Sequence, residues 1–186
     1  STGKKVAIIG GGPSGLTTAY FLQLMGHQCT VFEEKKQLGG MLRYGIPNYR
    51  FPRERLQEDI DAILSTGVEV KLNANIGTEE MKQIQQEYDA IYVAIGAHTD
   101  KKLGLEGEES KNVISAVDML REIGDGEYPD YTGKRVVVVG GGNVAMDAAR
   151  TALRLGAEVH IVYRRSEKEL PARVEEVHHA KEEGIH

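Results

Sequence analysis

An internal repeat constrains the fold of this chain more than any other feature of its sequence. Residues 5–12 read Lys-Val-Ala-Ile-Ile-Gly-Gly-Gly, and residues 135–142 read Arg-Val-Val-Val-Val-Gly-Gly-Gly. The offset of 130 residues holds without a gap for about thirty positions, so that Gly26 aligns with Gly156. Each copy runs from an apolar segment through a glycine cluster and a helical pattern to a second apolar segment. We therefore expect two βαβ units, each with a right-handed crossover.

The apolar segments also predict the kind of sheet. Short runs rich in Val and Ile are typical of parallel strands that are covered on both faces. The expected fold class is α/β, with two Rossmann-like βαβ nucleotide-binding domains on parallel sheets, divided near residue 100 into 1–100 and 101–186. Helices are expected at 14–25 and 143–155, and one face of the second carries Val144, Ala148, Thr151, Ala152 and Leu155.

Further elements are expected between the two copies. Residues 97–112 are charged and contain glycine, so they are expected to form a linker. The remaining patterns predict helices at 51–65, 79–87 and 113–123 and strands at 68–72 and 90–95.

Composition excludes several classes of protein. The chain has 27% charged and 40% hydrophobic residues, an ordinary globular mixture, and its net charge of −5 argues against a nucleic-acid partner. No apolar run approaches the length of a membrane span, and no signal peptide opens the sequence. Cys29 is the only cysteine, which excludes an internal disulfide and a cysteine-held metal cluster. A reducing cytoplasm suits such a chain, and Cys29 is expected to be buried in a strand.

The first glycine cluster predicts a dinucleotide site. In Gly10-x-Gly12-x-x-Gly15, Gly10 allows a tight turn, Gly12 lets a pyrophosphate approach the backbone, and Gly15 lets the helix pack close to the strand. The helix N-terminus then offers free N–H groups to the phosphates. The alternative is a tight strand-to-helix turn that binds nothing.

The end of the second strand predicts which nucleotide binds. A carboxylate at Glu33 would accept hydrogen bonds from both ribose hydroxyls and repel a 2′-phosphate, which favours FAD or NAD. Glu34 is adjacent and could take the same role, and a solvated glutamate is the alternative.

The second cluster differs where the ligand would be recognised. It reads Gly140-x-Gly142-x-x-Ala145, and alanine in the third position is tolerated. The repeat aligns Tyr163 with Glu33, and Arg164 and Arg165 follow it. Guanidinium groups suit a 2′-phosphate, so this copy favours NADP(H), with a solvated basic turn as the alternative.

Two unlike nucleotide sites in one chain suggest an electron relay from nicotinamide to flavin. No catalytic residue is required, because the cofactors supply the chemistry and the protein supplies orientation. Asp147 and Arg150 are expected to pair on a helix surface or between elements. His178 and His179 are expected at a solvated helix end rather than on a metal, because adjacent helical residues point in different directions.

Longer motifs resemble a known family. The chain is similar to the NADPH-dependent glutamate synthase small (beta) subunit, and also to the flavin–NADPH part of dihydropyrimidine dehydrogenase and the large subunit of NADH-dependent ferredoxin:NADP oxidoreductase. The motifs cover nearly the whole chain but do not separate these members. They are 6–16, 38–47, 92–97, 140–150, 163–166 and 170–173.

The resemblance implies an FAD domain over 1–100, an NADP(H) domain over 101–186, and an iron–sulfur protein or domain as electron acceptor. The residues that it assigns to FAD are Gly10, Gly12, Pro13, Ser14, Gly15, Glu33, Gly40, Met41, Leu42, Arg50, Ile76 and Gly96. Those that it assigns to NADP(H) are Gly140, Gly142, Asn143, Val144, Ala145, Arg164, Arg165 and, less directly, Arg173.

Departures from the family pattern suggest a fragment in which both domains are incomplete. The cysteine-rich iron–sulfur domain and the segment that returns to the flavin are missing, so an uncovered sheet edge is expected to drive self-association. Three readings stay open: an NADPH-linked flavin oxidoreductase core, a dinucleotide-binding fragment without catalysis, and a structural subunit of an electron-transfer complex.

Overall fold

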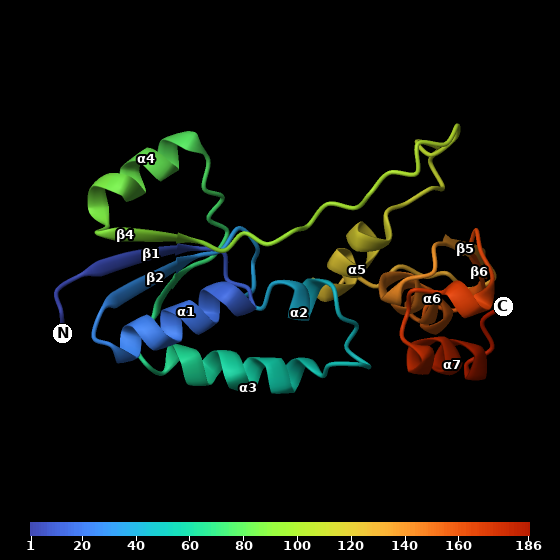
Figure 1. Cartoon of the computed structure of the whole chain (residues 1–186), viewed down its shortest axis with the longest axis horizontal. Coiled ribbons are helices and arrows are strands. Elements are labelled where there is room, and N and C mark those ends of the chain that lie inside the picture. The colour runs from blue at the N-terminus through green and yellow to red at the C-terminus, as the bar shows by residue number, and fades with distance from the viewer. The chain divides into compact units, whose positions relative to one another are not determined.

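The computed structural model describes residues 1–186 as two compact units, Ser1–His98 and Thr99–His186. Each unit contains a parallel sheet with helices packed on it (Figure 1). None of the helices has the length and apolar character that a membrane crossing demands.

The first unit is a four-stranded Rossmann-like sheet. Its strands follow the order β3-β2-β1-β4, and every neighbouring pair is parallel. The elements are β1 (Lys5–Ile9), α1 (Pro13–Leu24), β2 (Gln28–Phe32), α2 (Met41–Tyr44), α3 (Arg53–Leu64), β3 (Glu69–Lys71), α4 (Thr78–Glu87) and β4 (Ala90–Val93).

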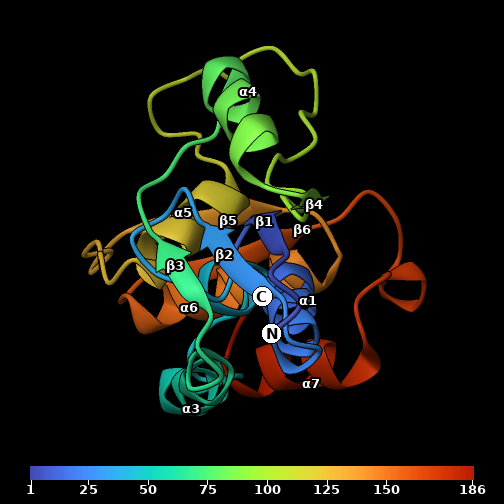
Figure 2. The same cartoon turned by 90° about the vertical axis from the view of Figure 1, so that its left-hand side faces the viewer.

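Alternate residues of β1 enter two different cores, because successive side chains of a strand point to opposite faces. Val6 and Ile8 pack with residues of α1 and α3, whereas Ala7 and Ile9 pack with residues of α4. Figure 2 shows α4 on the side of the sheet opposite α1 and α3. The expectation that this strand is covered on both faces is confirmed.

The second unit has a smaller sheet in which β5 and β6 pair in parallel. The backbone of His186 also bonds to β6, since its N–H donates to Val159 O at 3.2 Å and its carbonyl accepts from Ile161 N at 2.7 Å. The elements are α5 (Ala116–Gly124), β5 (Arg135–Val139), α6 (Asn143–Arg154), β6 (Glu158–Val162), the 3-10 turn η1 (Glu167–Glu169) and α7 (Val174–Glu182).

Only one face of β5 is covered, so the expectation of two covered faces is wrong for this strand. Val136 and Val138 pack into the cores beneath the helices, but Val137 and Val139 are 57% and 58% exposed. No helix of this unit lies on their side of the sheet. Val144, expected on the apolar face of α6, is also 51% exposed.

Element boundaries depart from expectation where capping decides them. The helix expected from residue 113 begins at Ala116, because Ser115 caps it by accepting a hydrogen bond from Asp118 N at 3.3 Å. The helix expected from residue 51 begins at Arg53, after Pro52. Sequence periodicity did not predict the four-residue helix α2.

A partly buried ion-pair network joins α6 to α7. The guanidinium of Arg150 contacts Glu176 at 2.9 Å and Glu183 at 2.8 Å, and Arg154 contacts Glu183 at 2.7 Å. Arg150 therefore pairs between elements through Glu176 and Glu183, and its expected pairing with Asp147 stays a prediction. Hydrogen bonds from Arg154, and then from Arg150, lower the pKa of Glu183 from 4.5 to about 2.

This lowered pKa predicts an acid-sensitive fold. A carboxyl whose pKa is lower in the folded chain stabilises it above the unfolded value, and this contribution is lost as the pH falls from about 4.5 toward 2. Glu183→Gln should cost at most about 3 kcal/mol at pH 7 and much less at pH 3, measured by urea unfolding. The exposed Glu175→Gln on the same helix is the control, and an equal loss from Glu183→Gln at both pH values would contradict the prediction.

The open face of β5 predicts self-association. The double variant Val137→Thr, Val139→Thr should lower the concentration-dependent light scattering of the chain, because it removes apolar surface without entering the core. Val174→Thr is the matched control, since Val174 is 80% exposed on α7. Equal scattering from both variants would show that this face does not drive association.

Candidate functional site

The first glycine turn joins β1 to α1, and packing within the unit requires two of its glycines. Gly10 has a positive φ of +114°, and a methyl group there would collide with the carbonyl oxygen of Ala94. A methyl group on Gly15 would collide with the carbonyl oxygen of Gly10. These contacts account for the tight turn and the close helix packing that the spacing predicts.

Packing does not require Gly12. Its φ of −83° and ψ of −173° suit any residue, and a methyl group would lie 3.5 Å from the Cα atom of Gly40, an ordinary contact. The space beside Gly12 is therefore open to a ligand. The same is true of Gly142, where no protein atom lies within 4 Å of such a methyl group.

Both helices that follow the turns present uncompensated N-termini. No side chain caps α1 or α6, and neither has an acidic residue in its first turn. The free N–H groups in the first turn of each helix, which in α1 start after Pro13, and the positive end of its dipole thus remain available to an anion.

Glu33 lies against the first turn. Its side chain is buried, and its two oxygens accept hydrogen bonds from Gly11 N at 2.7 Å and Lys35 N at 2.8 Å. Glu34 is half-exposed and pairs with Lys35 Nζ at 3.1 Å. Of the two carboxylates that could face a ribose, only Glu33 bonds to the turn.

A short segment covers each turn, and we call these the cover segments. In the first unit it is residues 38–40: Leu38 packs on Gly11, Gly39 N donates to Gly11 O at 2.9 Å, and Gly40 lies over Gly12. Gly40 leads directly into α2, which carries Met41 and Leu42.

In the second unit the cover segment is residues 170–173. Leu170 packs on Gly141, and Ala172 N donates to Gly141 O at 3.0 Å. A methyl group on Gly141 would lie only 2.6 Å from Leu170 Cδ2. The turn itself keeps a positive φ of +141° at Gly140 and accommodates the methyl group of Ala145.

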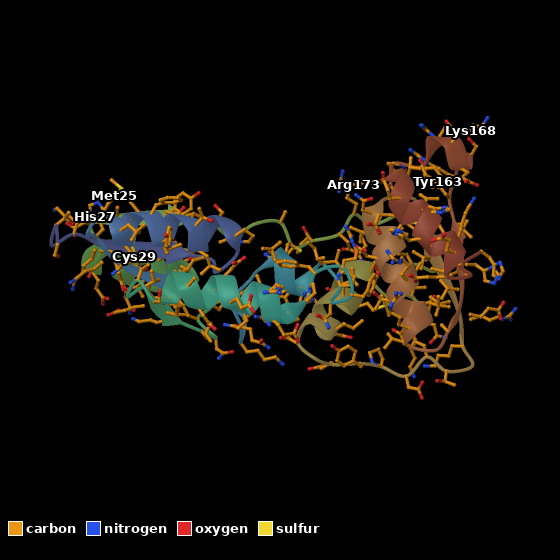
Figure 3. The ribbon with its side chains drawn as sticks, turned by 90° about the horizontal axis from the view of Figure 1, so that it is seen from below. Met25, His27, Cys29, Tyr163, Lys168 and Arg173 are labelled. Carbon is orange, nitrogen blue, oxygen red and sulfur yellow. The ribbon has the colours of Figure 1, made fainter.

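The end of β6 carries the two arginines that the repeat singled out. Tyr163 packs on Gly141, with a methyl group there lying 2.7 Å from Tyr163 Cδ2, so it occupies the position of Glu33 in the first unit. Arg165 faces Glu169 at 3.8 Å, whereas Arg164 is exposed and has no ion pair. Tyr163 and Arg173 lie at the end of the unit from which the loop bearing Lys168 projects (Figure 3).

Three predicted residues have contacts elsewhere in the first unit. Arg50 follows α2, with its N–H bonded to Pro47 O at 3.0 Å. Ile76 packs beside Phe32 in the core under α4. Gly96 follows β4 with a φ of +68° and lies near His98.

Several residues at the turns were not predicted. Ala94, Leu38 and Leu170 contact the glycines directly. In the sequence they are ordinary small or apolar residues, and nothing marks them as neighbours of a turn. Tyr92 was also missed, and its hydroxyl lies 2.9 Å from Ser14 Oγ at the start of α1. Hydrogen bonds from Ser14 and Thr18 lower the pKa of Tyr92.

The remaining candidates take no part in either turn. Cys29 is buried near the end of α1 that lies away from the turn, close to Met25 and His27 (Figure 3), and burial raises the pKa of its thiol. His178 is exposed on α7, where it pairs with Glu182 at 3.1 Å.

Comparison with known proteins decides the family. The chain matches the pyridine nucleotide-disulphide oxidoreductase family over residues 4–186. It belongs to this family. FprA of Mycobacterium tuberculosis, solved in complex with NADPH, has the same fold, with a TM-score of 0.80 and 23% identity over 98% of this chain and 48% of that one.

Relatives confirm the resemblance to the glutamate synthase group. The glutamate synthase [NADPH] small chain of Escherichia coli K12 is 38% identical over 99% of this chain and 42% of its own length. The NADP(+)-dependent formate dehydrogenase subunit beta of Moorella thermoacetica is 48% identical over all of this chain, and the NADPH-Fe(3+) oxidoreductase subunit beta of Geobacter sulfurreducens is 49% identical over 98%. The chain spans only 27% and 28% of these last two proteins.

The contrast between Gly12 and Gly15 gives a test. Gly12→Ala should change the free energy of unfolding by no more than about 1 kcal/mol, because the poorer N-cap opposes the gain from a less flexible unfolded chain. It should nevertheless weaken dinucleotide binding, because its methyl group fills the ligand's space. Gly15→Ala should destabilise the unit by about 1–3 kcal/mol through its collision with Gly10. Urea unfolding and titration calorimetry separate the two effects, and unchanged binding by Gly12→Ala would contradict the assignment.

Proposed function

We propose that the chain is the NADPH:FAD core of an oxidoreductase that passes electrons from NADPH through FAD to an iron–sulfur partner. Family membership and the names of the relatives support an oxidoreductase that uses a pyridine nucleotide. Because the chain spans less than half of each of these relatives, the activity of the whole protein is part of the proposal.

The observation that carries the proposal is the open space at Gly12 and Gly142. Packing explains Gly10 and Gly15, but no protein atom explains the absence of a side chain at the other two positions. Each open glycine adjoins an uncapped helix N-terminus with no acidic residue in the first turn of the helix. This combination fits a pyrophosphate that approaches the backbone.

The first unit, assigned to residues 1–100, fits FAD. Glu33 is fixed by two backbone N–H groups, and each of its oxygens keeps a lone pair for a ribose hydroxyl. Gly40 borders the open space at Gly12 on one side, where a bound cofactor would contact it. Met41, Leu42, Arg50, Ile76 and Gly96 complete the proposed FAD residues.

The second unit, assigned to residues 101–186, fits NADP(H). Tyr163 replaces the carboxylate that would repel a 2′-phosphate, and the exposed guanidinium of Arg164 follows it. Gly142 is uncovered, which suits a coenzyme that exchanges. Bound FAD would supply hydride acceptance and one-electron release, while these residues bind and orient the two nucleotides.

Reconstitution tests the function. Chain mixed with FAD and then freed of unbound flavin by gel filtration should stay yellow, with an absorbance band near ~450 nm that bleaches on addition of NADPH under anaerobic conditions. A bleaching rate with NADH equal to that with NADPH would contradict the coenzyme assignment. Nucleotide binding without any bleaching would favour the dinucleotide-binding fragment without catalysis.

The two arginines at the end of β6 are predicted to contribute unequally. Arg164→Ala should weaken NADPH binding about tenfold and leave NADH unchanged, because its guanidinium is uncommitted. Arg165→Ala should cost less, because Glu169 already faces that guanidinium. Calorimetric titration with both coenzymes measures these affinities. Equal losses for NADPH and NADH would contradict the proposal that these arginines bind the 2′-phosphate.

A further inference from the structure

A side-chain hydrogen bond ties the second glycine turn to the start of α7. Asn143 is the first residue of α6 and follows Gly142 directly. Its Oδ1 accepts a hydrogen bond at 2.9 Å from the backbone N–H of Arg173, which lies thirty positions later and precedes α7. The guanidinium of Arg173 is thus carried by backbone that is fixed at the turn.

The cover segment does not need this bond in order to dock. Leu170 packs on Gly141 and Ala172 N bonds to Gly141 O, and the first unit uses the same two contacts through Leu38 and Gly39. The repeat aligns Asn143 with Pro13, which has no side-chain acceptor. The Asn143 bond is therefore an addition found only in the second copy.

The same loop brings two arginines to one glycine. Tyr163 packs on Gly141 from one end of the loop, and Ala172 bonds to Gly141 from the other. Arg164 directly follows Tyr163, and Arg173 directly follows Ala172. The two arginines therefore flank the same turn. Both are exposed and neither has an ion pair.

We propose that Asn143 is a positioning residue that holds Arg173 beside Arg164, so that the two guanidinium groups together bind the 2′-phosphate of NADP(H). The inference rests on the proposed NADPH function and goes beyond it by naming the residue that sets coenzyme selectivity from a distance. Asn143 acts through the backbone of Arg173 and contributes no charge of its own.

Adenosine 2′,5′-bisphosphate and adenosine 5′-monophosphate are the probes, because they differ only in the 2′-phosphate and need no flavin. Asn143→Ala in the full chain should weaken the bisphosphate about fivefold more than the monophosphate, which is the scale of one lost hydrogen bond. Asn143→Pro, which installs the residue of the first copy at a helical position that tolerates proline, should do the same. Titration calorimetry measures both affinities, and thermal unfolding checks the fold.

A double-mutant cycle separates positioning from a general structural role. In an Arg173→Ala background, which keeps the backbone N–H but removes the guanidinium, Asn143→Ala should cause no further loss. An additive loss, or an equal loss of monophosphate binding, overturns the proposal. So does unchanged bisphosphate binding by both Asn143 variants.

The outcome for Arg164→Ala tells the two proposals apart. If that variant loses bisphosphate affinity while the Asn143 variants do not, the NADPH function stands and the positioning role is wrong. If the unmodified chain binds the two probes equally, the NADPH assignment is wrong and the positioning role is overturned with it.

Discussion

Both units depend on the close approach of a helix N-terminus to the end of a parallel strand. In the first unit this approach leaves no room for a side chain at Gly10 or Gly15, because the carbonyl oxygens of Ala94 and Gly10 occupy the space. The strand must therefore leave the sheet with a positive φ, and the helix must start within three residues. That geometry aims uncapped N–H groups at one edge of the sheet, where Gly12 leaves an opening.

The two copies share this scaffold and differ in what surrounds it. Glu33 bonds to Gly11 in the first copy, and the ring of Tyr163 packs on Gly141 in the second. Gly40 lies over the first turn, whereas Gly142 stays open. The scaffold therefore explains how a phosphate could be held in either unit, and the surrounding residues explain why two different nucleotides are proposed.

The repeat was sufficient to predict the parallel βαβ units, because strand and helix periodicities differ and glycines mark the turns. Placing Glu33 and Tyr163 at equivalent positions also followed from the alignment. The docking of Leu170 on Gly141 could not be predicted, because the two cover segments lie at different distances from their turns and apolar residues carry no local signal of their partner. The exposure of Val137 could not be predicted either, since a run of valines does not reveal how many faces a helix will cover.

The matched cover segments bear on the history of the chain. A duplicated half keeps residues that packing demands, such as Gly11 and Gly141 beneath the leucines of their cover segments, and is free to change those that only a ligand meets. The exchanges of Pro13 for Asn143 and of Glu33 for Tyr163 then record the divergence of two descendants of one ancestral half. Acquiring a second coenzyme would have required few substitutions at the rim of an inherited turn, with no redesign of the fold.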